Sequence, residues 1–148
     1  NAPPYEEVAF YLQSLKNTNQ EVGSGMIGEL ETAMNEQDFL SHLKHSMNLN
    51  TIKYTPLNGK SIKKVAVCGG AGSFLLPIAK GAGADAFVTS DFKYHEFFDA
   101  EGKLMIADIG HYESEVYTKE LLSAFISEKF ANIATYLSEV DTNPVKYF

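Results

Sequence analysis

Residues 65–72 have the sequence Val-Ala-Val-Cys-Gly-Gly-Ala-Gly, and they begin the pattern that decides the fold class. The first four predict a short buried strand, because small and β-branched apolar side chains suit a pleated surface covered on both faces. The glycines that follow predict a tight loop over residues 69–73. A helix is expected over residues 74–80, ended by Gly81 and Gly83.

The order of strand, loop and helix repeats along the chain. Further strands are expected over residues 86–89 and 104–107, followed by helices over residues 92–98 and 114–130. A last strand is expected over residues 134–140. Strands that alternate with helices at this spacing need crossover connections, which place the strands parallel in one sheet. The sequence therefore predicts an α/β fold, a three-layer sandwich with a largely parallel central sheet.

Shorter elements are expected ahead of this unit. Residues 3–15 suit a helical turn that runs into a strand, and residues 26–30 suit a short strand within a glycine-rich stretch. Asn35 is expected to cap a helix with an apolar stripe. Residues 51–55 are rich in β-formers, and Asn58-Gly59 predicts a turn after them.

Composition narrows the class of protein. The 148 residues suffice for one domain, and 45% hydrophobic with 21% charged residues is typical of globular proteins. A net charge of −7 argues against nucleic-acid binding, and no apolar run reaches the roughly 20 residues of a membrane span. The single cysteine, Cys68, excludes an internal disulfide and a cysteine-rich zinc cluster. A reducing compartment is favoured, and we expect a cytoplasmic protein without membrane or nucleic-acid partners.

The candidate site is expected where the strands end, because open α/β sheets bind ligands beyond the carboxyl ends of their strands. His111 and Glu115 are four residues apart at the start of a helix, so both side chains can face one ion. Imidazole with carboxylate suits zinc, iron or manganese. Asp91 and His95 repeat this spacing on the preceding helix, and Asp108 could orient an imidazole.

Each of these residues also has an interpretation without a metal. A histidine and a glutamate at helical spacing are common by chance, and Glu115 would also stabilise the helix dipole. Asp91 is a natural N-cap, and His95 could be a surface residue. These alternatives stay open at the level of sequence.

The glycine-rich loop raises the possibility of a nucleotide site. Gly70 and Gly72 match the first two glycines of a dinucleotide fingerprint, and Asp91 lies where a ribose-binding acid would fall. Leu75 stands at the third glycine position, and Pro77 lies in the first turns of the following helix. A close-packed turn between strand and helix explains the same residues.

Several motifs in one order resemble the GTP cyclohydrolase I type 2 homologues, also called NIF-three-like proteins. The resemblance covers most of the chain. Its motifs are residues 25–30 (Gly-Met-Ile-Gly-Glu-Leu), 65–72, 83–86, 89–95, 108–115 (Asp-Ile-Gly-His-Tyr-Glu-Ser-Glu) and 143–147 (Asn-Pro-Val-Lys-Tyr).

The resemblance implies a NIF-three-like C-terminal domain and a two-metal centre between α/β modules, often within a ring-shaped oligomer. His111 and Glu115 match the family's C-terminal metal ligands, and Asp91 with His95 matches a stretch that lines the pocket, positioning substrate or relaying protons. The family's N-terminal half, with its paired histidines, has no counterpart here. Residues 1–20 are similar to the tail of a preceding inserted domain or linker, so residues 21–148 are expected to form an α/β half-domain of the metal site.

These expectations combine into one functional hypothesis. Zinc usually takes at least three protein ligands, and His111 with Glu115 supplies two. We therefore expect part of a dinuclear metal-dependent hydrolase of unknown substrate, with two divalent transition-metal ions (zinc, iron or manganese) in the full-length parent. This chain alone is expected to bind metal weakly or not at all and to be inactive. Expected partners are the missing N-terminal half, further copies of the protein and a small-molecule substrate.

Two alternatives belong to other functional classes. One is a non-enzymatic oligomeric regulator or scaffold with a structural metal. The other is a nucleotide-binding α/β module that uses the loop from Gly69 to Gly72.

Overall fold

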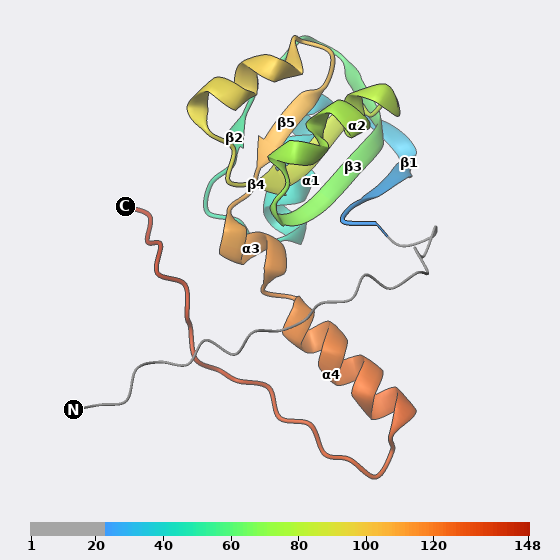
Figure 1. The fold of residues 1–148 in the computed structure, drawn as a ribbon, viewed down its shortest axis with the longest axis vertical. Coiled ribbons are helices and arrows are strands. Elements are labelled where there is room, and N and C mark those ends of the chain that lie inside the picture. Colours follow the sequence, from blue (N-terminus) through green and yellow to red (C-terminus); the bar gives the residue numbers. More distant parts are fainter. Residues whose placement is uncertain (1–22) are drawn as a thin grey trace, which may run out of the picture.

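The computed structural model describes residues 23–148, in which five strands form one sheet with helices on both of its faces (Figure 1). The elements are β1 (Met26–Asn35), α1 (Glu36–Ser46), β2 (Lys53–Tyr54), β3 (Ser61–Ala71), the 3-10 helix η1 (Ser73–Leu75), α2 (Leu76–Gly81), β4 (Ala86–Ser90), the 3-10 helix η2 (Tyr94–Ala100), β5 (Met105–Asp108), α3 (His111–Glu115) and α4 (Thr118–Lys129).

The sheet has the strand order β1-β3-β4-β5-β2. The three central strands, β3, β4 and β5, run parallel, as the alternation of strands and helices predicted. The two outer strands are antiparallel to their neighbours, β1 to β3 and β2 to β5. The α/β class is confirmed, and the sheet is parallel at its centre only.

Two hydrophobic cores lie on opposite faces of the sheet. One packs Phe87 and Ile106 against α2 and η2, and the other packs Ile62 and Val88 against Phe39 of α1. Every residue of β4 is buried, because helices cover both of its faces. Burying each large apolar side chain contributes about 1.5–3 kcal/mol, so the central strands supply much of the fold's stability. The layers are therefore helix, sheet and helix.

The helix α1 begins where the sequence predicted. Asn35 Oδ1 accepts a hydrogen bond of 2.8 Å from the backbone N–H of Asp38, which is the geometry of an N-cap. The buried Glu36 carboxylate accepts hydrogen bonds from the backbone N–H groups of Asn58 and Gly59. These bonds fasten the predicted turn to the start of the helix.

Three expectations about the central unit need correction. The loop expected over residues 69–73 is mostly strand, because β3 continues to Ala71. The helix expected over residues 92–98 is the 3-10 helix η2, which begins at Tyr94. The helix expected over residues 114–130 occurs as α3 and α4, separated at residues 116–117. The reason is that α3 packs against β3, whereas α4 leaves the domain (Figure 1).

The strand expected over residues 134–140 is not formed. A strand needs a neighbour to pair with, and no strand of residues 23–148 pairs with this segment. Instead the segment is tied to α4: the hydroxyls of Ser123 and Thr135 lie 2.7 Å apart, and Lys119 donates to the carbonyl of Ser138. The expectations for residues 3–15 and 1–20 lie outside the described residues.

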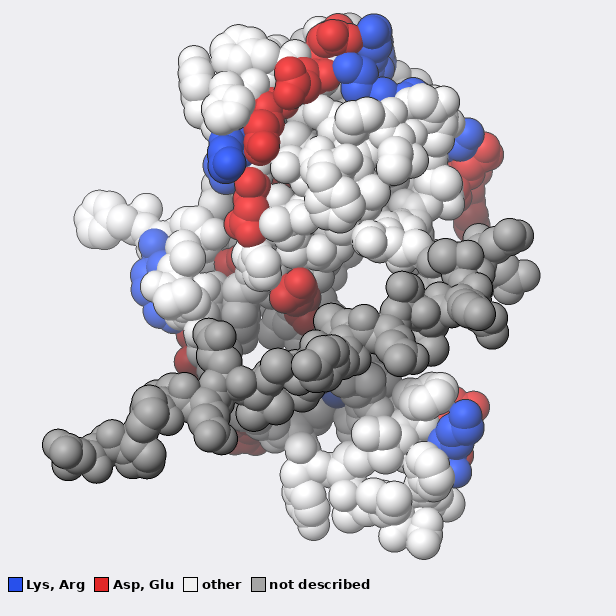
Figure 2. Space-filling view, viewed as in Figure 1, with Lys and Arg blue, Asp and Glu red and all other residues white. Residues whose placement is uncertain are grey.

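We call α4 with residues 130–140 the arm. Figure 1 shows α4 extending away from the sheet, and Figure 2 shows largely uncharged surface over it. No residue of the arm is buried, although Leu121, Leu122, Phe125 and Leu137 are apolar. None of the helices formed by residues 23–148 combines the length and apolar character needed to cross a bilayer.

Candidate metal centre

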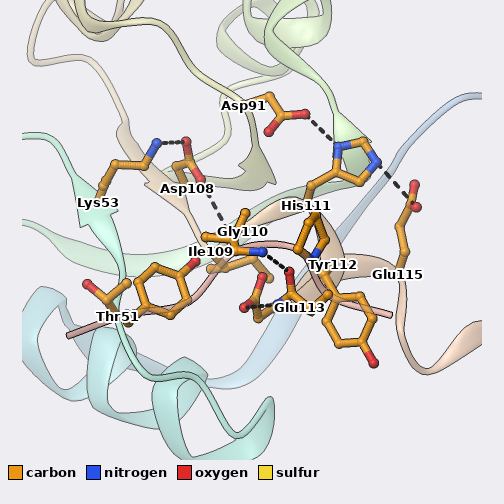
Figure 3. A pocket seen from close by; sticks show the side chains of 14 residues that line it. Thr51, Lys53, Asp91, Asp108, Ile109, Gly110, His111, Tyr112, Glu113 and Glu115 are labelled. Atoms are coloured by element: carbon orange, nitrogen blue, oxygen red, sulfur yellow. Dashed lines mark hydrogen bonds and ion pairs between the residues drawn. The ribbon is translucent and has the colours of Figure 1, made fainter. Parts of the chain in front are cut away.

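A pocket of about 490 Å³ lies at the carboxyl ends of β4 and β5. Because these strands are parallel, the residues that follow them meet at one edge of the sheet. Figure 3 shows His111 between Asp91 and Glu115 on one side of this pocket, with Lys53 and Asp108 on the other. The sequence had placed the candidate site at this edge.

Asp91, His111 and Glu115 form one connected cluster. His111 Nδ1 donates to Asp91 Oδ2 over 2.5 Å, and His111 Nε2 lies 3.4 Å from Glu115 Oε2. The three side chains are half exposed at the pocket wall. Both ring nitrogens therefore face carboxylates, one from the loop after β4 and one from the same helix.

The two carboxylates change the protonation of His111. The hydrogen bond that His111 donates to Asp91 is the main cause that raises the pKa of His111 above its usual value. The negative charges of Asp91 and Glu115 raise this pKa further, while partial burial opposes them. The ring therefore holds a proton more tightly than a free imidazole, and any metal ion at Nε2 has to displace it.

Gly70 makes room for this cluster. Its φ of +64° lies in the left-handed region, and a Cβ at this position would lie 2.6 Å from Glu115 Oε1 and 3.4 Å from His111 Cε1. At Gly72, a Cβ would collide with the Thr89 hydroxyl. Both glycines therefore have packing roles that account for their presence without a nucleotide.

Ser114 joins α3 to β3. Its hydroxyl donates to the carbonyl of His111 over 2.7 Å and accepts from the N–H of Gly70 over 2.8 Å. The hydroxyl thus ties the helix that carries His111 and Glu115 to the strand beneath it. Sequence reasoning missed this role, since the contact with Gly70 spans 44 positions.

Asp108 has a different partner from the one expected. The sequence suggested that it orients an imidazole, but Asp91 contacts the His111 ring instead. The carboxylate of Asp108 is buried and accepts from the backbone N–H groups of Phe92 and Gly110, each over 3.1 Å. It also pairs with Lys53 Nζ at 2.7 Å. The Asp108 carboxylate therefore holds two backbone segments in place: the one that follows Asp91 and the one that precedes His111.

His95 and Asp91 are not a helical pair. Asp91 has a φ of +59° and lies three residues before η2, so it neither caps that helix nor shares a face with His95. His95 is exposed on η2 and is not among the residues that line the pocket. Cys68 is a buried free thiol whose pKa is raised by burial and by the charge of Glu115, so it belongs to the packed core and stays protonated near neutral pH.

The last residues of the chain close another side of the pocket. Asn143 Nδ2 donates to Glu113 Oε1 over 3.2 Å, which holds Glu113 away from the His111 cluster. Tyr147 also lines the pocket, and burial, with the charges of Glu113 and Asp108, raises the pKa of its hydroxyl. Its phenol thus stays protonated near neutral pH.

Comparisons with known proteins agree with the motifs. A family model described as Duf34/NIF3 (NGG1p interacting factor 3) matches residues 6–144. The chain is 36% identical over 148 residues to the GTP cyclohydrolase 1 type 2 homolog of Staphylococcus epidermidis, and 34% identical over 149 residues to that of Bacillus subtilis. Each match covers 97% of this chain but 40% of the relative, so the chain spans well under half of the length of these curated relatives.

Solved structures show the same similarity. Staphylococcus aureus protein SA1388 superposes with a TM-score of 0.73 at 30% identity, over 84% of this chain and 42% of that protein. A Bacillus cereus protein related to NIF3 gives a TM-score of 0.72 at 31% identity, over 85% and 36% respectively. The family model, the relatives and the fold agree, and this chain belongs to the Duf34/NIF3 family.

Proposed function

We propose that this chain supplies half of a dinuclear metal centre, with His111 and Glu115 as ligands, in a metal-dependent hydrolase of unknown substrate. The relatives called GTP cyclohydrolase 1 type 2 homologs suggest a hydrolytic reaction class. The proposal for the reaction rests on that similarity, whereas the proposal for the ligands rests on geometry.

The observation that carries the proposal is the 3.4 Å between His111 Nε2 and Glu115 Oε2. This separation is long for a hydrogen bond. Two ligands that each lie about 2.0–2.2 Å from one tetrahedral zinc ion are separated by about 3.4 Å. The direct ion pair therefore already has the separation that two ligands of one shared ion would have.

Asp91 supports the same arrangement. Metal-binding histidines usually donate their second ring N–H to a carboxylate or carbonyl, which fixes the tautomer and the orientation of the ring. The 2.5 Å bond from His111 Nδ1 to Asp91 has this form, and it turns Nε2 toward Glu115. We assign Asp91 the positioning of the imidazole, and its exposed carboxylate oxygen faces the pocket where a substrate proton could be received.

The donor set in this chain is incomplete. Within residues 23–148, no three His, Cys, Asp or Glu side chains are grouped so that they could hold an ion. We propose that the remaining ligands come from the part of the longer relatives that this chain does not span. Divalent zinc, iron or manganese ions bound there would supply Lewis acidity and activate water near neutral pH.

Metal content tests the ligand assignment. We would measure it by mass spectrometry in this chain and in the longer Bacillus subtilis relative, replacing the residues aligned with His111, Glu115 and Glu113 by alanine, one at a time. We expect near two ions per chain in the longer protein, substantial loss for the first two variants, and no loss for Glu113→Ala, because Glu113 is held by Asn143.

Two outcomes would contradict the assignment. The longer protein could contain no metal after purification and reloading, or the variant at the position of Glu115 could retain all of it. This chain alone is expected to bind less than one ion with useful affinity and to show no hydrolysis.

A scaffold is the second candidate function, and the arm favours it. The arm exposes the apolar side chains of Leu121, Leu122, Phe125 and Leu137, and groups of exposed apolar side chains are typical of interaction surfaces. We propose that further copies of the protein, or the rest of the longer protein, cover the arm. Metal that raises the melting temperature and the oligomer size without supporting turnover would favour the scaffold over the hydrolase.

A further inference from the structure

We propose that a groove beside the metal centre binds the planar aromatic ring of an anionic substrate, and that Lys53 holds the substrate's negative charge. This proposal rests on the proposed function for the reacting end of the substrate. It goes further by naming the class of molecule that the site accepts.

The groove has a volume of about 670 Å³, which is within the range of small-molecule sites. It lies between η2 and the segment from β2 to Asn58, and four of its eleven lining residues are aromatic. Tyr94 is 82% exposed and Phe98 is 67% exposed, although their rings contact each other edge to face at 5.6 Å between centroids. Tyr54, 49% exposed, faces them from the sheet edge.

Because Tyr94 and Phe98 are largely exposed, much of their ring surface is accessible in the groove. Exposed aromatic side chains that line a concave surface offer stacking to any planar ring, and such stacking does not depend on one particular hydrogen-bond pattern. These exposed aromatic side chains are the reason that we propose a planar aromatic ring in the substrate.

Lys53 connects the groove to the metal centre. It lines both the groove and the 490 Å³ pocket, and it is the only lysine or arginine among the described residues that line that pocket. The other ionisable neighbours there include four carboxylates, those of Asp91, Asp108, Glu113 and Glu115.

The ammonium group of Lys53 can bind a second anion. Its partner among residues 23–148 is Asp108 Oδ2 at 2.7 Å, and an ammonium group has three N–H donors. The side chain is 61% exposed, so its remaining donors are accessible. Asp108 in turn receives two backbone N–H bonds, which stabilise its charge if Lys53 turns partly toward a ligand.

The groove and the metal-ligand cluster are connected along the chain at two points. Tyr54 follows Lys53 in β2, which pairs with Asp108 and Ala107 of β5. Tyr94 comes three residues after Asp91, which contacts His111. Because Lys53 lines both cavities, an anion bound to it lies where the groove meets the pocket of His111 and Glu115.

Phenylphosphonate is the probe for this proposal, because it joins an aromatic ring to a doubly charged anion and resists hydrolysis. We would titrate it into the 148-residue chain with EDTA present, following amide shifts by NMR. Benzoate would show whether a carboxylate replaces the phosphonate, and methylphosphonate would show the contribution of the ring.

We expect saturable shifts at residues of the groove, with methylphosphonate binding at least about fivefold more weakly, as the loss of one stacking contact implies. Lys53→Met should weaken phenylphosphonate binding about tenfold or more, because it removes the ammonium group but keeps an aliphatic side chain of similar length. Phe98→Ala should weaken it about fivefold. Phe74→Ala is the matched control, because Phe74 is 63% exposed but does not line this groove, and it should have no effect.

The proposal fails if no saturable binding occurs, if methylphosphonate binds equally well, or if Phe74→Ala weakens binding as much as Phe98→Ala. It also fails if the longer Bacillus subtilis relative does not bind the probe, since polypeptide would then cover the groove. A double variant, His111→Ala with Glu115→Ala, separates the two proposals: it should lose metal sites but keep phenylphosphonate binding. Loss of the probe in that variant would overturn the separate ring and anion site.

Discussion

The central sheet and the arm both contain large apolar side chains, yet these side chains end in opposite environments. Residues of β4 are all buried, whereas no residue of α4 is. Phe87 in the sheet is 1% exposed and Phe125 in the arm is 55% exposed. The same residue type is therefore buried or exposed according to the packing partners that the described part of this chain provides.

The metal-ligand candidates lie at the boundary between these two regions. Helix α3 is anchored to β3 by Ser114 on one side and continues toward the arm on the other. His111 and Glu115 are thus fixed at their base and half exposed at their tips. This arrangement suits the proposed half-site, in which ligands from another part of the longer protein would have to reach the same ions.

The largest expected effect is the difference in stability between a substitution in the sheet and one in the arm. Phe87→Ala should lower the free energy of unfolding by about 3–5 kcal/mol, because it opens a cavity in a packed core. Phe125→Ala should change it by no more than about 0.5 kcal/mol in the 148-residue chain. Urea denaturation of both variants measures the contrast. Equal losses would mean that the arm is packed in solution.

Removal of Asp108 tests whether the two loops of the cluster depend on one carboxylate. Asp108→Ala should cost about 2–4 kcal/mol, since it leaves the N–H groups of Phe92 and Gly110 and the ammonium of Lys53 without their acceptor. Lys53→Met should cost much less, because the backbone bonds remain. NMR shifts of His111 should move in the first variant and stay nearly fixed in the second. The reverse order would contradict the bracing role.

Gly70→Ala tests whether Gly70 makes room for the metal-ligand candidates between the sheet and the arm. Left-handed backbone costs an alanine about 1–2 kcal/mol, and the new Cβ would also displace the Glu115 carboxylate. Gly59→Ala is the control, because Gly59 has a φ of +71° with open space around its Cα. Both variants should lose stability on thermal unfolding, but only Gly70→Ala should change the pKa of His111. Identical behaviour would show that Gly70 serves the backbone alone.

The smallest expected effect is on the pH dependence of the metal-free protein. The pKa of His111 should lie above about 6.5 and fall when Asp91→Asn removes the charged acceptor. A raised pKa in the folded state stabilises the protein below about pH 6.5, and this contribution is lost as the pH rises through the folded value. Imidazole NMR titration measures both pKa values. An unchanged His111 in Asp91→Asn would contradict the assigned cause.

Much of the fold could be predicted because strands and helices of the central unit depend on local pattern. The strands near residues 65, 86 and 105, the helix capped by Asn35 and the parallel centre of the sheet follow from periodicity and turn residues. Residues 134–140 show the limit of this reasoning. Their composition suits a strand, but a strand forms only where another strand offers its backbone groups.

The candidate site likewise contains one pair of residues that sequence spacing predicted and one that it did not. Sequence spacing predicted that His111 and Glu115 share a helix face, because four residues make about one turn. It paired Asp91 with His95, since helical spacing was assumed for a segment whose backbone turns left-handed at Asp91.

The fold class, the family and the edge of the sheet where polar residues gather follow from the amino-acid sequence alone, because these depend on patterns within short segments. Three features appear only in the folded chain: Asp91 orients His111, Asp108 braces two loops, and Gly70 makes room for Glu115. The bonds of Asp91 to His111 and of Asp108 to Phe92 join residues at least 16 positions apart, and the space at Gly70 depends on its left-handed backbone. Local propensity carries no information about such contacts, whereas the packing of strands and helices fixes them.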